Sequence, residues 1–479
     1  MLGVIIIKQI NELVEANKKY RYVQASMGLY FLWIGVMFQT PEYRASGSLV
    51  SYLTSPWLLF SLFYGAVYFF IGVFYKKIAP FFLRKESIYA VCAVLLIGTV
   101  LDFIVCPSLA SGVLYDVVYY SGMVLISIGT ASIMLVGGSA NAYIGARNTL
   151  LVCGTGMVFA MAAMVVIGLL EEIGRTAALM LIPLLMAFTN QRIFNTLPRK
   201  QVLCRGLKHD PLKPTKILAT SFFHGIAYSF LLIVLSLQPH MGSYLVFTGI
   251  FFLIGAVLVI GVTLFLNADY NKLLYQCAFP LIAIGMVFIA AFSEQQYIGC
   301  AFLAVGYYVL LTLMTGVCAY IANQFDLSAF WVLSLLTCCF MGGQIIGVLG
   351  IEIALSANVT MPVIACVLIF ILLVQSIFFS SNRNMRYGWG VVTPNTTETT
   401  MTPQEFAVQR LAADMKLTNR EAEIAFALAQ EKTRKQIAKD LVLSEETVKT
   451  HVSHIYTKVG VHSKEELMGV IDKLVSDSE

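Results

Sequence analysis

The chain has 479 residues and a formal net charge of +5, with 58% hydrophobic and only 12% charged residues. Soluble domains carry about 25% charged residues, so the composition excludes a soluble protein built around one large core. It indicates a polytopic membrane protein.

Residues 1–21 precede the first apolar run that is long enough to span a bilayer. The short apolar run inside them, Val4 to Ile7, is too short for a cleavable signal peptide. We expect a cytoplasmic N-terminal segment that forms a helix on the membrane surface.

Apolar runs of about 20 residues, the length that spans a bilayer, recur between residues 22 and 380. They lie at 22–38, 57–75, 87–105, 113–136, 149–170, 176–190, 217–237, 243–266, 273–292, 297–322, 329–353 and 360–380. Pro183 falls in the sixth run and Pro280 in the ninth, and helices buried among neighbours tolerate such prolines. The sequence therefore predicts an all-α, twelve-helix transmembrane bundle over residues 22–380.

Basic residues in the loops between these runs set the predicted orientation. With the N-terminus inside, the outer loops carry only Arg44 and Arg175. The inner loops carry Lys76, Lys77, Arg84, Lys85, Arg147, Arg192, Arg199, Lys200, Arg205, Lys208, Lys213, Lys216 and Lys272. Because an even number of spans returns the chain to its starting side, we expect both termini in the cytoplasm.

The longest inner loop, Gln191 to Lys216, divides the spans six and six. This layout resembles the major facilitator architecture of two six-helix halves. That family's loop between spans two and three reads G-x-x-x-D-R-x-G-R-R. The matching stretch has Gly72 and the basic residues Arg84 and Lys85, but it lacks the acid and the second glycine. The resemblance implies the fold without the transport gate that this loop serves.

Charges inside the spans bear on mechanism, because proton-coupled transporters need a carboxylate or histidine deep in a span. No acid lies at mid-depth, and His224 in the seventh span fits a hydrogen bond to a neighbouring helix. The acids near the predicted outer ends are Glu42, Asp102, Asp116, Glu171, Glu172, Glu294 and Glu352. They form either an acidic outer mouth for cationic or polar ligands or an ordinary solvated rim.

Polar and aromatic residues inside the apolar runs predict a central pocket. The candidate ligand-binding residues are Trp33, Tyr64, Tyr228 and Gln344. Glycines flank Gln344 in the run GGQIIG and allow either close helix approach or a cavity. No phosphate loop, nucleophile elbow or paired catalytic carboxylates occur, and the ten cysteines include no CxxC pair. We expect neither an enzyme nor a cofactor or metal site.

Residues 381–401 are polar, which indicates a tether to a last domain at residues 402–479. Thr402, with Pro403 at the first helical position, caps an expected helix through Leu411. Three capping boxes open further helices, and they pair Thr418 with Glu421, Thr433 with Gln436, and Ser463 with Glu466.

The stretch from Ser444 to Gly460 is the strongest local signal in this domain. Ser444 is a good N-cap, and the two acids that follow suit the positive end of a helix. One apolar stripe recurs at spacings of four, three and four, through Val448, Val452, Ile455 and Val459. A tight turn at Leu443 before it predicts a helix-turn-helix module.

This module resembles the LuxR/GerE-type DNA-binding domain, with the pattern L-T-x-R-E, then I-A, then S-x-x-T-V-K-x-H, then K-x-G-V. The matching residues are Leu417, Thr418, Arg420, Glu421, Ile437, Ala438, Leu441, Ser444, Thr447, Val448, Lys449, His451, Lys458, Gly460 and Val461. The usual Gly before the scaffold helix is replaced near Glu431 and Lys432. The usual Arg after the recognition helix is Lys464, which lacks a guanidinium fork.

The resemblance implies double-stranded DNA as a partner, with base contacts from Lys449, Thr450 and Ser453. Lys449 is the expected sequence reader, because Lys donates to guanine O6 and N7. The expected phosphate contacts are Thr433, Arg434, Thr447 and Lys458.

The remaining expectations concern packing and assembly. His451, at the edge of the apolar stripe, is expected to be a structural histidine with its hydrogen bonds satisfied. The family's homodimer contact is expected on the last helix, at Leu467, Val470 and Leu474.

These patterns predict a membrane-embedded one-component transcription regulator in the bacterial cell membrane. The bundle would sense an unknown small molecule, and the cytoplasmic module would read a two-fold operator. Two alternatives stay open. One is a secondary transporter of the major facilitator type with a fused regulatory domain, and the other is a sensor of a partner membrane protein.

Overall fold

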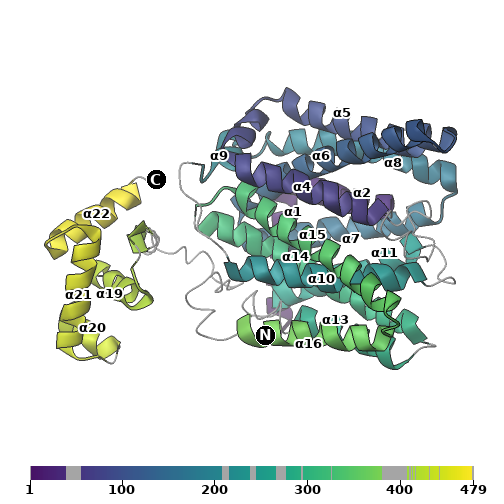
Figure 1. The fold of residues 1–479 in the computed structure, drawn as a ribbon. Helices are drawn as coiled ribbons and strands as arrows, with labels where there is room; N and C mark the ends of the chain where they lie inside the picture. The colour runs from purple at the N-terminus through teal and green to yellow at the C-terminus, as the bar shows by residue number, and fades with distance from the viewer. Residues whose placement is uncertain are drawn as a thin grey trace. The chain divides into compact units, whose positions relative to one another are not determined.

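Figure 1 shows the computed structural model. It describes residues 2–38, 56–207, 215–237, 244–265, 277–292, 295–324 and 326–379, then 407–408, 411–412, 414–415, 417–430, 432–441 and 443–476. These residues form helices and turns and no strand. Contacts divide the chain into two compact units, Met1–Pro394 and Asn395–Glu479. The predicted tether and the Thr402 cap lie outside the described residues.

Each predicted span of the first unit falls on a helix. The helices of the first group are α2 (Arg21–Phe38), α4 (Pro56–Ile78), α5 (Glu86–Val100), α6 (Val113–Ile144), α7 (Ala146–Gly168) and α8 (Glu172–Ile193). Those of the second group are α10 (Thr215–Leu237), α11 (Tyr244–Phe265), α13 (Phe279–Ala291), α14 (Gln296–Gln324), α15 (Ala329–Ser356) and α16 (Met361–Phe379).

The apolar composition of these helices makes the chain a multipass membrane protein. Within the described residues, nine helical segments are long and apolar enough to cross a bilayer, and α13 and α16 supply shorter apolar segments. The fold class is as predicted, and the count of twelve spans stays a prediction.

The helices pack side by side as two groups that share one core. In the first group α2 packs against α7 and α8, and α5 packs against α6 and α8. In the second group α10 packs against α15, and α13 packs against α14 and α16. The groups join where α4 meets α15 and where α7 meets α11.

Two predicted spans end differently in the structure. The third run does not continue as one α-helix, because α5 passes into a π-turn (Leu101–Val105) and a 3-10 turn (Cys106–Ser108). In the ninth run, Pro280 lies in the first turn of α13 instead of its interior. A proline is accommodated there because the first N–H groups of a helix have no intrahelical acceptor.

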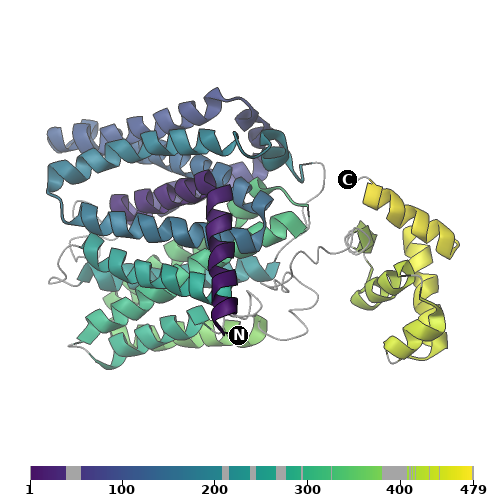
Figure 2. The same cartoon turned by 180° about the vertical axis from the view of Figure 1, so that it is seen from behind.

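The N-terminal residues form a helix, α1 (Leu2–Lys19), which runs at a steep angle to the other helices of the unit in Figure 2. It is tied to α7 by Arg147, whose guanidinium donates to both carboxylate oxygens of Glu12 at 2.5 and 2.9 Å. Arg147 also donates to the carbonyl oxygen of Thr263 on α11, at 3.1 Å. One arginine therefore links α1 to both helix groups.

The second unit contains α19 (Asn419–Ala429), α20 (Arg434–Asp440), α21 (Glu445–Val459) and α22 (Lys464–Ser476). Ser444 caps α21, and Gly460 ends it with a φ of 79°, a left-handed conformation that suits glycine. The buried residues of this unit's own core include Leu411, Ile424, Leu428, Ile437, Val448, Val452, Ile455, Leu467 and Ile471.

The predicted capping boxes at Thr418 and Thr433 form reciprocally. The third is only half formed. Ser463 accepts from the Glu466 backbone N–H, but the Glu466 carboxylate accepts from the His462 backbone at 2.7 Å. The predicted dimer residue Leu467 is fully buried in the core of its own domain, so it is not available for a partner. Val470 and Leu474 remain partly exposed.

Candidate functional site

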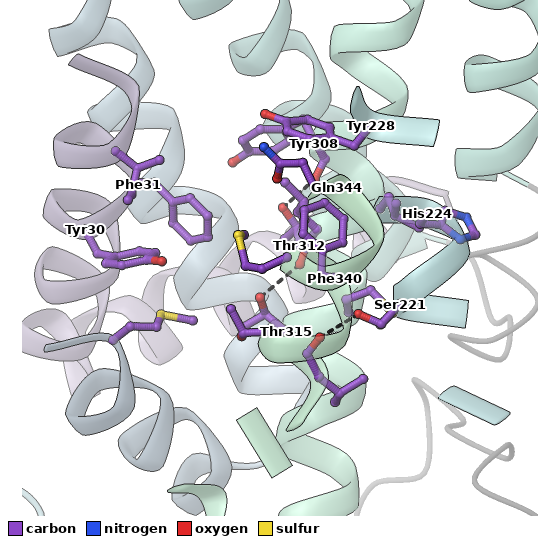
Figure 3. A pocket seen from close by; sticks show the side chains of 18 of the residues that line it. Tyr30, Phe31, Ser221, His224, Tyr228, Tyr308, Thr312, Thr315, Phe340 and Gln344 are labelled. Carbon is purple, nitrogen blue, oxygen red and sulfur yellow. Dashed lines mark hydrogen bonds between the residues drawn. The ribbon is translucent and has the colours of Figure 1, made fainter. Parts of the chain in front are cut away.

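The first unit contains a partly open cavity of about 230 Å³ between the two helix groups. Its wall comes mainly from α2, α4 and α7 of the first group and from α10, α14 and α15 of the second. Figure 3 shows Tyr30 and Phe31 on one side, facing Tyr308, Phe340 and Gln344 on the other. A movement of one group against the other would therefore change this space.

Hydroxyl groups form a chain along one side of the cavity and into the helices behind it. The Tyr30 and Tyr64 hydroxyls lie 2.7 Å apart, and those of Tyr64 and Tyr68 lie 3.1 Å apart. Tyr68 also hydrogen-bonds to the side chain of Thr337 on α15. The chain therefore connects α2 through α4 to the second helix group.

Two polar side chains in the wall remain available for a ligand. No hydrogen bond joins the Gln344 amide or the Tyr228 hydroxyl to another described residue, whereas the Tyr308 hydroxyl bonds to the Thr312 side chain. Buried polar groups are nearly always hydrogen-bonded. Tyr228 and Gln344 are therefore the groups that a bound molecule would satisfy.

The wall is mostly apolar and carries no formal charge. None of the described residues that line it is Asp, Glu, Lys or Arg. Burying an unpaired charge there would cost several kcal/mol, so the lining fits an uncharged ligand. At about 230 Å³ the cavity is smaller than the roughly 300–1,000 Å³ of drug-binding pockets, and it suits a compact molecule.

Three of the four predicted ligand-binding residues lie in this wall: Tyr64, Tyr228 and Gln344. The fourth, Trp33, does not, because its indole N–H donates to Thr130 on α6 at 3.1 Å. Ligand binding by the other three stays a prediction.

Sequence reasoning missed a polar stripe on α14. Tyr308, Thr312 and Thr315 face the cavity at spacings of four and three. That spacing within an apolar run is a signal that could have revealed them.

The histidine beside the cavity and the acids that the structure describes in the bundle do not point at the cavity centre. His224 borders the cavity, but its ring points away from Gln344 in Figure 3 and contacts Gln375 of α16 at 3.3 Å. A hydrogen bond to a neighbouring helix was the predicted role. Of the acids predicted near the outer ends of the spans, the structure describes five. Two are buried, Asp102 and Glu352. The other three are exposed and fit an acidic rim: Asp116, Glu171 and Glu172.

The second unit presents the residues predicted to read bases. Lys449, Thr450 and Ser453 are exposed on one side of α21, opposite its buried apolar stripe. The Lys449 ammonium lies 3.1 Å from Glu446, but both side chains are well exposed, at 60% and 78%. An exposed ion pair of this kind contributes about 0–1 kcal/mol, so Lys449 can leave it for a base.

The predicted phosphate contacts divide into two sets. Thr433 and Arg434 lie exposed at the start of α20. Thr447 and Lys458, which are partly exposed, are hydrogen-bonded to other residues of the same domain. The Thr447 hydroxyl lies 2.7 Å from that of Ser444, and the Lys458 ammonium lies 2.6 Å from Glu421.

Glu421 is the buried charge around which α19 and α21 pack. Its side chain is only 4% exposed, and its Oε2 accepts from Lys458 and from the Thr418 backbone, each at 2.6 Å. Burial alone would raise the pKa of Glu421, but these bonds outweigh burial and lower it. Lys458 therefore has a packing role that the sequence did not reveal.

A second packing role falls to Arg420. Its guanidinium bonds to Glu423 and to the carbonyl oxygen of Leu441, at 2.5 and 2.6 Å. The bond to Leu441 ties α19 to the turn that follows α20, and the bond to Glu423 lies within α19. The basic residues of this unit thus serve partly to hold the reading helix in place.

Residues 415–471 match the family described as bacterial regulatory proteins, luxR family. The uncharacterized response regulatory protein YgeK of Escherichia coli is 49% identical over 59 residues, covering 12% of this chain and 40% of that protein. The Fimbriae Z protein of Salmonella typhimurium is 42% identical over 55 residues, 12% of this chain and 26% of that protein. The chain thus spans two fifths or less of these two relatives. The spore germination protein GerE of Bacillus subtilis is 44% identical over 50 residues, 10% of this chain and 68% of that protein.

The first unit is similar in fold to solved transporters. The E. coli fucose:proton symporter FucP has a TM-score of 0.50 at 13% identity, over 76% of this chain and 98% of that one. The major facilitator proton:xylose symporter XylE has a TM-score of 0.55 at 11% identity, over 78% and 98%. The human organic anion transporter MFSD10 has a TM-score of 0.52 at 13% identity, over 76% and 99%. At these identities the likeness shows the fold alone, a bundle of the major facilitator type.

Each of the two units is similar to known proteins. The bundle shares its fold with transporters, and the C-terminal unit carries the sequence, helices and caps of a LuxR-type helix-turn-helix. Through this C-terminal domain, the chain belongs to the luxR family of bacterial regulatory proteins.

Proposed function

We propose that the protein is a membrane-embedded one-component transcription regulator, in which a small uncharged molecule bound in the bundle controls DNA binding by the C-terminal domain. The observation that carries the proposal is an uncharged cavity between two helix groups, in the same chain as a LuxR-type domain. A ligand that binds one arrangement of the groups more tightly shifts the bundle toward it.

Both termini lie on the cytoplasmic side in this proposal, and the module acts as a dimer on a two-fold operator. The distribution of basic loop residues supports the orientation. Symmetric dimers on palindromic sites are the usual arrangement of helix-turn-helix proteins.

A secondary transporter with a fused regulatory domain is the second candidate, favoured by the fold shared with symporters. The uncharged lining favours sensing over proton coupling, because proton-coupled carriers place an ionisable group in the pathway. Uniport of an uncharged molecule would leave this lining unchanged.

Two measurements on the full chain in proteoliposomes separate the candidates. A ligand is first found by a thermal-shift screen of compact neutral molecules, and its binding and its uptake into the proteoliposomes are then measured. A sensor is expected to bind this ligand without net uptake. Uptake that scales with the number of chains would assign the bundle to transport instead.

Substitutions in the wall test the site itself. Gln344→Ala and Tyr228→Ala are expected to shift the dose response of the target promoter without changing the amount of protein in the membrane. Tyr120→Ala is the matched control, because Tyr120 is exposed and lies outside the wall. An unchanged dose response in both wall variants would place the sensing site elsewhere.

A further inference from the structure

A cluster of three metal-ligating side chains lies where the recognition helix packs on α19. His451 and His454 are one helical turn apart on α21, and Glu421 faces them from α19. One ligand atom from each lies within 4.8 Å of the others. His454 lies one turn after Thr450 on α21, beside the surface that carries Lys449, Thr450 and Ser453, and His451 lies nearer the buried stripe.

The spacing of these atoms does not match a hydrogen-bonded cluster. His454 Nδ1 and Glu421 Oε1 are 3.9 Å apart, beyond the 2.7–3.2 Å of an N–H···O hydrogen bond. Two ligands of a tetrahedral zinc ion, each about 2.0–2.2 Å from it, lie roughly 3.4 Å apart. A small side-chain adjustment of the exposed His454 would close this difference.

His451 supplies the second observation. Its Nδ1 is buried and has no hydrogen-bond partner among the described residues, which differs from the satisfied structural histidine expected from the sequence. A buried nitrogen left unpaired costs about 1–3 kcal/mol. An ion held between α21 and α19 would supply the missing partner.

The Glu421 carboxylate has one oxygen, Oε1, that could bind an ion. Lys458 and the Thr418 backbone both donate to Oε2 of Glu421, so Oε1 is the oxygen on the side of His454. These bonds keep Glu421 ionised, as a metal ligand must be. The Lys458 ammonium repels a cation, which limits the affinity of the cluster.

We propose that Glu421, His451 and His454 form a binding site for a divalent transition-metal ion such as Zn²⁺, which fixes the recognition helix on α19. Two imidazoles and one carboxylate are a known zinc ligand set with a fourth position for water. Imidazole nitrogens disfavour Ca²⁺ and Mg²⁺, which take oxygen ligands. Because Ser453 precedes His454, metal supply would act directly beside the surface proposed to read DNA.

Metal binding by the full chain tests this inference, and the test does not require the small molecule that is proposed to bind in the membrane bundle. The protein, purified in detergent with a tag that contains no histidine, is stripped with a chelator and titrated with Zn²⁺ and with Co²⁺. The expected result is one ion per chain, with the visible absorption of tetrahedral Co²⁺ and a higher melting temperature for the C-terminal domain.

Variants assign the ion to the cluster. His454 is 60% exposed, so His454→Gln leaves packing intact and is expected to weaken Zn²⁺ binding by at least about 10–100-fold, the loss seen when even an outer partner of a ligand is removed. His462→Gln, outside the cluster, should bind as the parent does. No Co²⁺ absorption band, or zinc affinity in His454→Gln equal to that of the parent, overturns the proposal.

Discussion

Lys449 is the residue on which sequence-specific reading is expected to depend. Its side chain is exposed and held only by a weak pair with Glu446. Lys449→Ala should cost about 1–3 kcal/mol on the specific duplex and relax base preference at one position per half-site. Mobility shifts on specific and scrambled duplexes measure both effects. Lys435→Ala is the control, because it removes an exposed charge at the start of α20 and should lower the affinity for both duplexes alike. If Lys449→Ala also lowered both affinities equally, Lys449 would not be a base reader.

Lys458 gives a different prediction because its ammonium pairs with the buried Glu421. Lys458→Ala should destabilise the C-terminal domain by about 1.5–3 kcal/mol, the contribution of a hydrogen bond to a charged group. Its effect on DNA affinity should be small once the folded fraction is taken into account. Urea unfolding of this domain, compared between Lys458→Ala and Lys435→Ala, measures the cost. A fully stable Lys458→Ala protein with weaker DNA binding on every sequence would instead support the predicted phosphate contact of Lys458.

The same carboxylate makes the domain sensitive to acid. The pKa of Glu421 is lowered in the folded state, so its contribution to stability is present above the unfolded value of about 4.3. That contribution is lost as the pH falls through the lowered folded pKa. Stability of the parent should therefore fall more steeply below about pH 4.5 than that of Glu421→Gln. Parallel slopes in the two proteins would show that Glu421 is not the group that titrates.

At the residue scale, the sequence predicted mainly interactions between residues that are close together in the chain. The caps at Thr418, Thr433 and Ser444 and the stripe through Val452 follow from contacts within a turn or two of helix. The partner of Lys458 is 37 positions away, and nothing in the spacing of one helix reveals it. Trp33 failed as a pocket residue for the same reason, because the direction of its side chain depends on a hydrogen bond to α6.

Among elements, the contact of α10 with α15 should respond sharply to a single added methyl group. A Cβ on Gly343 would lie 2.0 Å from the carbonyl oxygen of Phe222, whereas a Cβ on Gly342 would meet nothing within 4 Å. Gly343→Ala should therefore destabilise the bundle by about 1–3 kcal/mol through overpacking. Gly342→Ala should be neutral or slightly stabilising, because Ala is the better helix former.

Melting temperatures of the two variants in the same detergent check this contrast. Since Gln344 follows Gly343 directly, Gly343→Ala should also weaken binding of any cavity ligand. Equal stability of the two variants would mean that α10 and α15 do not approach as closely as described.

The positions of the elements were predictable because apolar runs of fixed length leave little choice in a bilayer. Each predicted span coincides with a helix. The ends were less predictable, since the π-turn around Asp102 and the start of α13 at Phe279 depend on packing and on one proline. The glycines around Gln344 allowed both close approach and a cavity, and the structure contains both.

At the scale of the whole molecule, orientation in the membrane is the expectation that joins the two units. Reporter fusions after Leu83, Arg205 and Pro394 should report a cytoplasmic position, and those at Pro41, Pro239 and Asn358 an external one. The physical reason is the concentration of basic residues in the predicted inner loops. A cytoplasmic signal at Pro239 would break the span count and the argument that the module faces the chromosome.

The charge of the DNA-binding domain predicts how it must assemble. From Leu417 to Glu479 there are nine Lys and Arg against eleven Asp and Glu, a net charge of about −2. Among the side chains that the structure describes, four of these basic residues pair with acids of the same domain: Arg420, Lys432, Lys449 and Lys458. Because phosphate neutralisation supplies most non-specific affinity, one module should bind DNA weakly and with a shallow salt dependence.

Two modules on a two-fold site should gain about 10²–10⁴ in affinity over one half-site, through the effective concentration of the second module. Mobility shifts of the full chain, on a duplex selected from a random library and on its half-site, measure this gain at two salt concentrations. With Leu467 buried in its own core, the partly exposed Val470 and Leu474 remain as the dimer contact on α22. Val470→Glu should therefore abolish the gain, because a charge on this surface opposes pairing. Val470 also packs partly against the core of its own domain, so half-site binding, which should be unchanged, is compared at equal folded fraction. Equal affinity for one and two half-sites in the parent protein would show that a single module is sufficient.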